Sequence, residues 1–238
     1  MILALDTTLG ACSVAIGERE SGVLGFEYHE RARGHAEAIV PMIERVVAKA
    51  GRSRTEISGI ACTTGPGSFT GVRVGLAAAK GLALGLGVRL AGIPTLEALA
   101  ASLLFDDPSS GTEDGRVLAV IDGPRGGFIA QAFTIDPAKV RVEPMAEIEG
   151  VSEDQASNMD FKAIAFIVGP AAQRLADIAG GTAAKAIVRQ ADARVICRYV
   201  FAATEDRWQE NLSPIYFRPP HATPAKPPPW IKPGARLS

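Results

Sequence analysis

The pattern of apolar and polar positions predicts an alternation of strands and helices over the first hundred residues. Three short apolar runs separated by turn residues open the chain, and the first connection is of hairpin size. An amphipathic stripe and two further strand–helix pairs come next. The predicted strands cover residues 2–6, 12–17, 23–30, 58–64 and 88–92, and the helices cover 35–50, the glycine-rich stretch after residue 67, and 95–104. This order implies a mixed sheet flanked by helices.

The opening pattern returns in part after a polar, acidic connection at 105–115. Residues 117–122 resemble residues 2–6, and each run ends in an aspartate, Asp122 or Asp6, before a turn and a second apolar strand. This weak repeat indicates two related halves. The second half, with a strand at 163–168 and helical patterns near 170–180 and 192–205, is shorter and less regular.

Composition suggests where these halves end. The last 25 residues hold eight of the 16 prolines, four basic residues and no acidic one, which is typical of an extended tail. We therefore expect an N-terminal domain at 1–104, a smaller C-terminal domain at 105–212 and a proline-rich basic tail at 213–238.

Charge and cysteine usage narrow the class of protein. The formal net charge is −1, so no overall basic field attracts the chain to nucleic acid or to an anionic membrane. The three cysteines share no metal-like spacing, which favours buried free thiols in a reducing compartment. The first residues lack a basic leader, and Lys80 divides the longest apolar stretch. The sequence is typical of a cytoplasmic protein without a membrane span.

The stretch from Thr64 to Gly85 carries the strongest local signal. Each glycine inside a helix costs roughly 1 kcal/mol relative to alanine, so this helix must have another use for its glycines. Several small residues share one face, which would allow a second helix to approach closely, either the 35–50 helix or one from another chain. That face consists of Gly71, Gly75, Ala78, Leu82 and Gly85.

Two features near this helix could bind an anion or a metal–phosphate. The loop with Gly65 and Gly67 could present backbone N–H groups to an anion, or it could simply be a tight strand-to-helix turn. It fits neither the P-loop nor the dinucleotide fingerprint. Asp6, with Thr7 and Thr8, could hold a hydrated magnesium ion, or it could cap its own turn. For Asp122 the capping role is favoured, because Pro124 stiffens the loop.

No catalytic constellation is visible in the sequence. The three histidines, His29, His35 and His221, are too scattered for a metal site, and no nucleophile is paired with a base. His35, close to the start of its helix, is better suited to capping or to an interface.

Three motifs carry a resemblance to a known family. They are ILALDTTLGACSVAI, HAEAIVPMIERVV, and TGPGSFTGVRVGLAAAKGLALG with GIPTLEALA after it. Together they resemble the TsaB (YeaZ-like) family of bacterial tRNA threonylcarbamoyladenosine biosynthesis proteins, non-catalytic paralogues of the TsaD family. The resemblance covers the first hundred residues densely and resumes at VLAVIDGPRGG and PIYFR.

The resemblance implies an actin-like (ribonuclease H-like), duplicated α/β fold whose second half is reduced. It also implies a role in attaching threonylcarbamoyl to the adenosine beside the tRNA anticodon. The catalytic paralogue carries two metal-binding histidines where this chain has Thr95 and Leu99, and neither residue replaces an imidazole ligand. The chain therefore resembles the non-catalytic member, with no metal site of its own.

The resemblance further implies partners and a docking surface. The expected partners are a TsaD-like catalytic paralogue, a TsaE-like ATPase and, through the complex, tRNA; a homodimer is expected when the paralogue is absent. The isolated chain is expected to bind no cofactor, and ATP or ADP with magnesium only within the complex. The docking surface would consist of His35, Ile39, Met42, Ile43 and Val46 on one helix and Gly71, Gly75, Ala78 and Leu82 on the other.

These features leave three candidate functions. The first is an accessory subunit that positions the catalytic paralogue. The second is a kinase or ATPase that uses Asp6, Thr7 and Thr8 with the Gly65–Gly67 loop as its nucleotide site. The third, an endopeptidase, lacks a nucleophile–base pair and a zinc ligand set.

Overall fold

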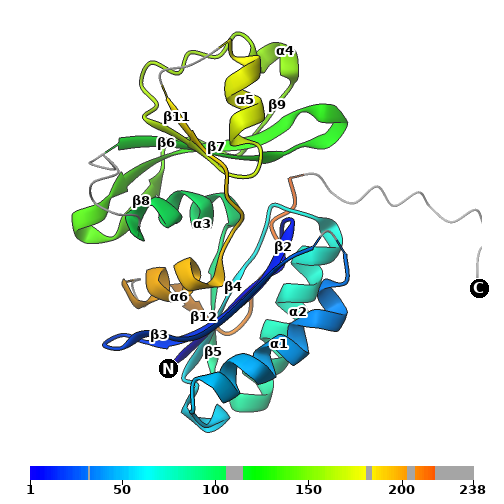
Figure 1. Cartoon of the computed structure of the whole chain (residues 1–238), viewed down its shortest axis with the longest axis vertical. Helices are drawn as coiled ribbons and strands as arrows, with labels where there is room; N and C mark the ends of the chain where they lie inside the picture. Colours follow the sequence, from blue (N-terminus) through cyan, green and yellow to red (C-terminus); the bar gives the residue numbers. More distant parts are fainter. Residues whose placement is uncertain (32, 106–114, 181–183, 203–206, 218–238) are drawn as a thin grey trace, which may run out of the picture.

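The structure is a computed structural model that describes residues 1–31, 33–105, 115–180, 184–202 and 207–217. Two β-sheets lie one above the other, each with helices on its faces (Figure 1). The elements up to residue 105 are β1 (Ile2–Asp6), β2 (Ala11–Glu18), β3 (Gly22–Glu30), α1 (His35–Lys49), η1 (Arg54–Glu56), β4 (Gly59–Thr63), α2 (Phe69–Leu86), β5 (Arg89–Ile93), α3 (Thr95–Ala101) and η2 (Ser102–Phe105).

The elements of the second half are shorter. They are β6 (Gly115–Asp122), η4 (Pro124–Gly126), β7 (Phe128–Asp136), η5 (Pro137–Lys139), β8 (Arg141–Pro144), β9 (Glu149–Val151), α4 (Glu153–Ala156), β10 (Phe166–Val168), α5 (Ala172–Ile178), β11 (Lys185–Ile187), α6 (Ala193–Ala202) and β12 (Trp208–Gln209). The five strands and three helices predicted for the first part are confirmed, with small shifts at their ends.

The two sheets repeat one topology. In the first, the order β3-β2-β1-β4-β5 combines an antiparallel β1–β2–β3 meander with β4 and β5, which run parallel to β1. In the second, the order β8-β7-β6-β10-β11 repeats the same pattern of antiparallel and parallel pairs. The weak repeat in the sequence therefore reflects a duplicated fold, and the prediction of two mixed sheets flanked by helices is confirmed.

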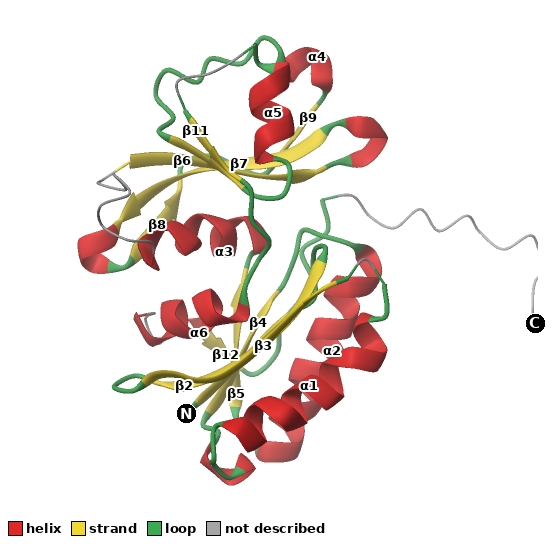
Figure 2. Ribbon diagram, viewed as in Figure 1, coloured by secondary structure: helices red, strands yellow, loops and turns green. Residues whose placement is uncertain are grey.

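Helices fill three layers around these sheets. α1 and α2 cover the outer face of the first sheet, α3 and α6 lie between the two sheets, and α5 covers the outer face of the second (Figure 2). The middle layer belongs to one continuous core, which contains Ala4 and Ala61 of the first sheet and Val117 and Phe133 of the second. The two halves are thus joined through a shared hydrophobic interior.

The end of the chain returns to the first half. α6 lies on the first sheet, where the Ala193 N–H donates to Ser13 Oγ at 2.9 Å in the interior. β12 adds an antiparallel strand to β5, with Trp208 opposite Ala91. The expected C-terminal domain at 105–212 is therefore wrong in its last part, because α6 and β12 pack on the first sheet rather than on the second.

The expected tail also starts later than residue 213. The Ile215 N–H donates to the Thr64 carbonyl at 2.7 Å, and the Tyr216 ring lies 5.4 Å from that of Phe69. The Phe217 ring lies against Gly150 of the second half. Residues 213–217 are therefore part of the folded structure, whereas the remainder of the predicted tail lies outside the described residues.

Helix α2 is long and apolar enough to cross a membrane by length and composition alone, in spite of Lys80. It lies instead on the first sheet, with Val72, Leu76 and Ala79 buried in the core between helix and strands. Ser68 Oγ caps its N-terminus by accepting from the Gly71 N–H at 3.0 Å, and Gly87 at φ 69° ends it. It is a sheet-packed helix with a second, uncovered side.

Candidate functional site

The Asp6 carboxyl is enclosed where β1 ends. It is fully buried, and its Oδ1 accepts from the Thr8 N–H (3.2 Å), Thr8 Oγ1 (2.7 Å) and Thr63 Oγ1 (2.5 Å). Its Oδ2 is buried and has no hydrogen-bond partner among the described residues. Burial raises the pKa of Asp6, although the hydrogen bonds from Thr63 and Thr8 act in the opposite direction. The carboxyl thus organises its own turn from inside the protein.

The glycine-rich loop packs directly against this turn. A Cβ on Gly67 would lie 2.3 Å from the Thr8 carbonyl oxygen, and the Ser68 N–H donates to the same oxygen at 2.8 Å. On its other side, a Cβ on Gly65 would lie 2.4 Å from the Ile215 carbonyl oxygen. The two segments that the sequence singles out as anion or metal–phosphate candidates are therefore in contact. The close backbone contacts explain why both positions of this strand-to-helix turn are glycine.

The glycines of α2 divide into two groups. A Cβ on Gly71 would lie 2.0 Å from the Thr7 carbonyl oxygen, and one on Gly75 would lie 2.6 Å from Thr7 Oγ1. Thr7 Oγ1 also donates to the Gly71 carbonyl at 2.7 Å. The assignment of Gly71 and Gly75 to a partner interface is therefore wrong, because the first turn of the same chain needs their missing side chains. Gly81 and Gly85, by contrast, face open space.

The predicted interface residues of α1 point inward. His35, Ile39, Met42, Ile43 and Val46 are all buried, and the four apolar ones belong to the core against the first sheet. Four of these side chains are therefore not available to a partner in this structure, whereas Ile43 also lines a hollow between α1 and α2. An apolar stripe looks the same whether it faces its own sheet or another protein. Burial lowers the pKa of His35, whose Nδ1 has no hydrogen-bond partner in the part of the chain that the structure describes.

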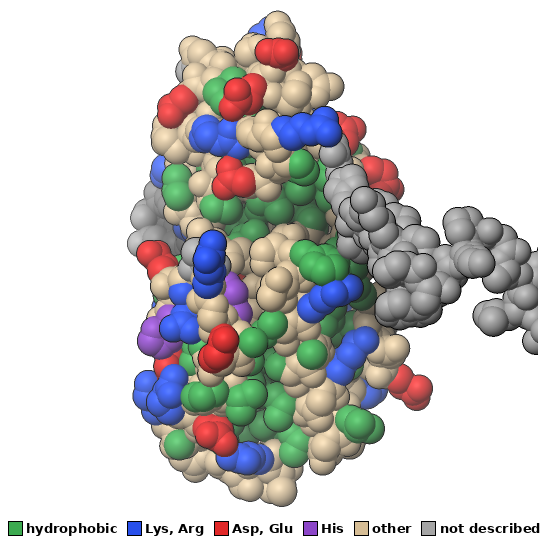
Figure 3. All heavy atoms as spheres, turned by 90° about the vertical axis from the view of Figure 1, so that its right-hand side faces the viewer, with side chains coloured by type: hydrophobic (Ala, Val, Ile, Leu, Met, Phe, Trp, Pro, Cys, Tyr) green, Lys and Arg blue, Asp and Glu red, His purple; other side chains and the backbone are tan. Residues whose placement is uncertain are grey.

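A different set of apolar residues is exposed on these helices. Leu84 is 87% exposed and Val40 is 55% exposed, whereas Ala78 and Leu82 are half-buried between them. A shallow hollow of about 280 Å³ lies between α1 and α2. Figure 3 shows apolar side chains gathered down the middle of this side of the molecule. We call this surface the α1/α2 face; it consists of Val40, Ala78, Gly81, Leu82 and Gly85, which line the hollow, and of Leu84, which is exposed on α2 outside the hollow.

The two positions where a catalytic relative would carry histidines lie in the interior. Thr95 and Leu99 are fully buried on α3, and Thr95 Oγ1 donates to Thr8 Oγ1 at 3.2 Å. Thr95 therefore extends the hydrogen-bond network around Asp6. Within the described ranges, no group of three or more histidine, cysteine, aspartate or glutamate side chains could hold a metal ion.

The cysteines behave as the sequence predicts. Cys12, Cys62 and Cys197 are free and buried. Burial raises the pKa of Cys12 to about 11 and those of Cys62 and Cys197 to about 12. Thiols with such pKa values stay protonated and act as small apolar groups.

The turn of the second half is built differently. Asp122 is exposed and accepts from Arg174 at 3.0 Å, and Arg174 also donates to the carbonyls of Gly126 and Gly127. Within this turn Arg125 adopts φ 57°, a conformation that a non-glycine residue seldom takes. The expected capping role of Asp122 is replaced by an ion pair, which the sequence did not indicate because Arg174 lies 52 residues away.

Sequence reasoning also missed an aromatic–arginine cluster beside the α1/α2 face. The Arg73 guanidinium lies 3.8 Å from the centre of the Phe69 ring, and its Nε donates to Tyr216 Oη at 3.2 Å. Phe69 and Tyr216 belong to two motifs that carried the family resemblance, but nothing in their spacing predicts that they meet.

Comparison with known proteins relates this chain to one family. The family model TsaD, tRNA N6-adenosine threonylcarbamoyltransferase, matches residues 21–176. The tRNA threonylcarbamoyladenosine biosynthesis protein TsaB of Escherichia coli K12 is 38% identical over 125 residues, which is 52% of this chain and 51% of that protein. The tRNA N6-adenosine threonylcarbamoyltransferase of Erythrobacter litoralis is 39% identical over 107 residues, 44% of this chain and 31% of that protein.

A solved structure supports the fold. A Pseudomonas aeruginosa protein with similarity to peptidase YeaZ superimposes with a TM-score of 0.74 and 24% identity, over 91% of this chain and 99% of that one. The chain spans about half the length of the curated TsaB of E. coli that it matches. The resemblance to TsaB and YeaZ is confirmed, and because the family model covers well over half of the chain, this protein belongs to the TsaD family of tRNA threonylcarbamoyladenosine biosynthesis.

Proposed function

We propose that this chain is a non-catalytic accessory subunit in threonylcarbamoyladenosine formation, and that it docks through its α1/α2 face to a catalytic paralogue of the TsaD type. The observation that carries the proposal is the exposed apolar surface around Leu84, on a helix whose other side is already packed on its own sheet. Exposed apolar patches of this kind, rimmed by polar residues, mark interaction sites. Membership of a family that contains both TsaB and the transferase supplies a partner of related shape.

The same surface would serve a homodimer when the paralogue is absent, because related faces are nearly self-complementary. Gly81 and Gly85 leave room for a second helix to approach α2 closely. The docking set thus differs from the sequence prediction: Ala78, Leu82 and Ile43, which lines the hollow, remain in it, whereas the other buried residues of α1, Gly71 and Gly75 do not. Phe69 and Arg73 extend it, since aromatic and arginine side chains contribute strongly to interfaces.

The buried residues of α3 and of the turn after β1 support the non-catalytic role. Thr95 and Leu99 are buried among apolar or hydroxyl groups, where neither can present a metal ligand. The site around Asp6 is closed by Gly67 and Gly71, which argues against the kinase or ATPase alternative. We therefore propose that the isolated chain binds neither ATP nor magnesium at Asp6, and that nucleotide, a TsaE-like ATPase and tRNA join it in the cytoplasm only through the complex.

The docking proposal is tested by placing a charge on the face. Leu84→Glu should leave the melting temperature unchanged, because the side chain is 87% exposed, and should weaken association with the purified paralogue at least 100-fold in calorimetry. Met145→Glu is a matched control, because Met145 is an exposed apolar residue of the second half. If the Leu84→Glu variant bound the paralogue as tightly as the wild-type protein does, the docking model would be refuted. In a reconstituted reaction, the same variant should lower threonylcarbamoyl transfer to the level found without the subunit.

A further inference from the structure

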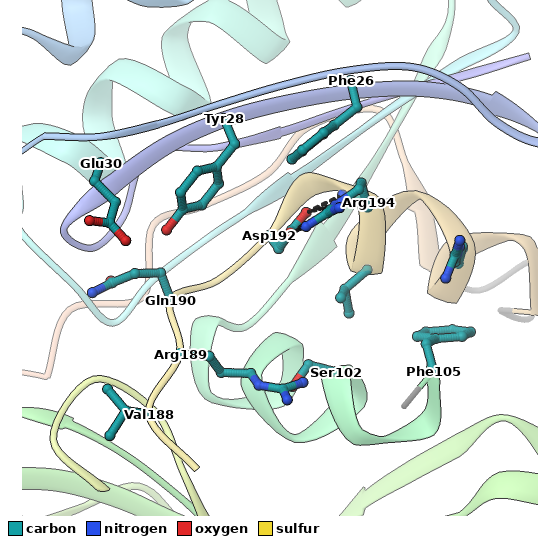
Figure 4. A pocket seen from close by; sticks show the side chains of 12 residues that line it. Phe26, Tyr28, Glu30, Ser102, Phe105, Val188, Arg189, Gln190, Asp192 and Arg194 are labelled. Carbon is teal, nitrogen blue, oxygen red and sulfur yellow. Dashed lines mark hydrogen bonds and ion pairs between the residues drawn. The ribbon is translucent and has the colours of Figure 1, made fainter. Parts of the chain in front are cut away.

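A second cavity lies on the opposite side of the first sheet from the α1/α2 face. It measures about 610 Å³, within the range typical of small-molecule sites, and lies between β3, η2 and the segment that leads from β11 into α6 (Figure 4). Alternation along β3 separates the two sides: Glu27 accepts from Arg45 of α1, whereas Phe26, Tyr28 and Glu30 face the cavity. A ligand bound here would not compete with docking.

One end of the cavity offers unused hydrogen-bonding groups. Tyr28 and Glu30 extend from β3 towards Gln190, as Figure 4 shows. Gln190 Oε1 accepts from the Gly10 N–H at 3.0 Å, which fixes the amide and leaves its Nε2 donors available. Neither the Tyr28 hydroxyl nor the Glu30 carboxylate has a side-chain partner within the described part of the chain. Burial and the Glu30 carboxylate raise the pKa of Tyr28, so its hydroxyl remains a donor.

A flat surface forms the middle of the cavity. Arg194 makes a bidentate pair with Asp192, at 2.6 Å between Nη2 and Oδ2 and 3.2 Å between Nε and Oδ1, so its charge is already neutralised. Its guanidinium plane lies 4.0 Å from the centre of the Phe26 ring. This stack is held rigidly in place, and arginine planes and aromatic rings of this kind are the platforms on which nucleobases stack.

The other end is basic. Arg198 lies over Phe105 at 5.9 Å and has no carboxylate partner within the described ranges, and Arg189 donates to Ser102 Oγ at 2.9 Å. Guanidinium groups bind phosphate strongly, with paired and directional hydrogen bonds. The cavity therefore has one end with a carboxylate acceptor beside hydroxyl and amide donors, a stacking surface and a cationic end.

From this arrangement we infer that the cavity binds a guanine nucleotide unit, with the base near Glu30 and the phosphate near Arg198. A carboxylate that accepts two N–H bonds matches the adjacent N1–H and N2–H₂ donors of guanine, whereas adenine presents an acceptor at N1. Gln190 Nε2 would donate to guanine O6. The unit could be a free nucleotide or a guanosine in single-stranded RNA, since both present the same base, ribose and phosphate.

The test uses the isolated full chain, so that failure of the docking proposal has no bearing on it. GMP, AMP and two single-stranded RNA pentamers, one with a central guanosine and one with a central adenosine, are titrated and monitored by calorimetry. We expect GMP or the guanosine pentamer, or both, to bind at least tenfold more tightly than the adenine counterpart. Binding of GMP alone identifies a free nucleotide, and binding of the pentamer alone identifies RNA.

Two variants separate the ends of the cavity. Glu30→Gln should abolish the tenfold preference for guanine, and Arg198→Ala should weaken both bases at least fivefold; both residues are exposed, so the fold should survive. Glu149→Gln, an exposed carboxylate on β9, is the control and should change nothing. Absence of binding at millimolar concentration, equal affinity for guanine and adenine, or binding that neither variant alters would overturn the inference.

Discussion

The turns after β1 and β6 occupy equivalent places in the two halves, yet their aspartates have opposite surroundings. Asp6 is fully buried, and hydroxyls and a backbone N–H surround its Oδ1. Asp122 is 69% exposed in its side chain and pairs with Arg174. The difference arises from the helix beside each turn: the 18-residue α2 packs Gly71 and Gly75 against the first turn, whereas the seven-residue α5 extends the Arg174 side chain to the second. Duplicating a fold has not duplicated a site.

Of the variants that test this comparison, Gly71→Ala should have the largest effect on stability. Its Cβ would lie 2.0 Å from the Thr7 carbonyl oxygen, so backbone must move, and we expect a loss of about 3 kcal/mol in the free energy of unfolding. Gly81→Ala on the same helix meets no atom within 4 Å and should stabilise by about 0.5–1 kcal/mol. Urea denaturation measures both. Equal effects at the two positions would show that contact with the Thr7 turn is not the reason why position 71 requires glycine.

We expect Asp6→Asn to have an intermediate effect on stability, measured as a function of pH. Because the folded-state pKa of Asp6 is raised above its ordinary value near 3.8, the wild-type protein loses stability as pH rises from there through the folded pKa. Asparagine keeps an acceptor oxygen and does not ionise. The melting temperature of the variant, relative to wild type, should therefore rise with pH across this window. A difference independent of pH would contradict burial of the acid.

The smallest effect should come from the second turn. Arg174→Ala removes ion pairs with Asp122 and Glu153 and a contact 4.0 Å from the centre of the Phe128 ring. The guanidinium is about a third exposed, so screening by solvent limits the loss to about 1 kcal/mol. Thermal melts at low and high salt should show this loss shrinking as ionic strength rises. A loss as large as that of Gly71→Ala would remove the contrast between the turns.

The sequence predicted the elements that are long and strongly patterned. The β1–β3 meander, α1 and α2 could be predicted from apolar periodicity, whereas β8, β9, β11 and β12 were missed because two to four residues carry no measurable period. The presence of two related halves could be inferred from the partial repeat. After residue 122, where that repeat weakens, the predicted boundaries of the elements and of the second domain were unreliable.

The candidate site was harder to predict, because its contacts are distant in sequence. Nothing local distinguishes Gly75, which lies against Thr7, from Gly85, which faces open space, although both belong to the same helix. The stripe on α1 is equally ambiguous, since a core face and a docking face have the same composition. The cavity beside Tyr28 combines β3 with residues more than 150 positions later, beyond the reach of any motif.

The return of the chain end to the first sheet has a consequence for synthesis. Cys197 lies against Ile2, and β12 and Ile215 complete the edge near β5 and Thr64. The ribosome adds roughly 5–20 residues per second, so the first sheet waits on the order of ten seconds, without its inner helix and edge strand, while the second half is made. Until then its alanine-lined face is uncovered. The N-terminal half is therefore the first to emerge and among the last to be completed.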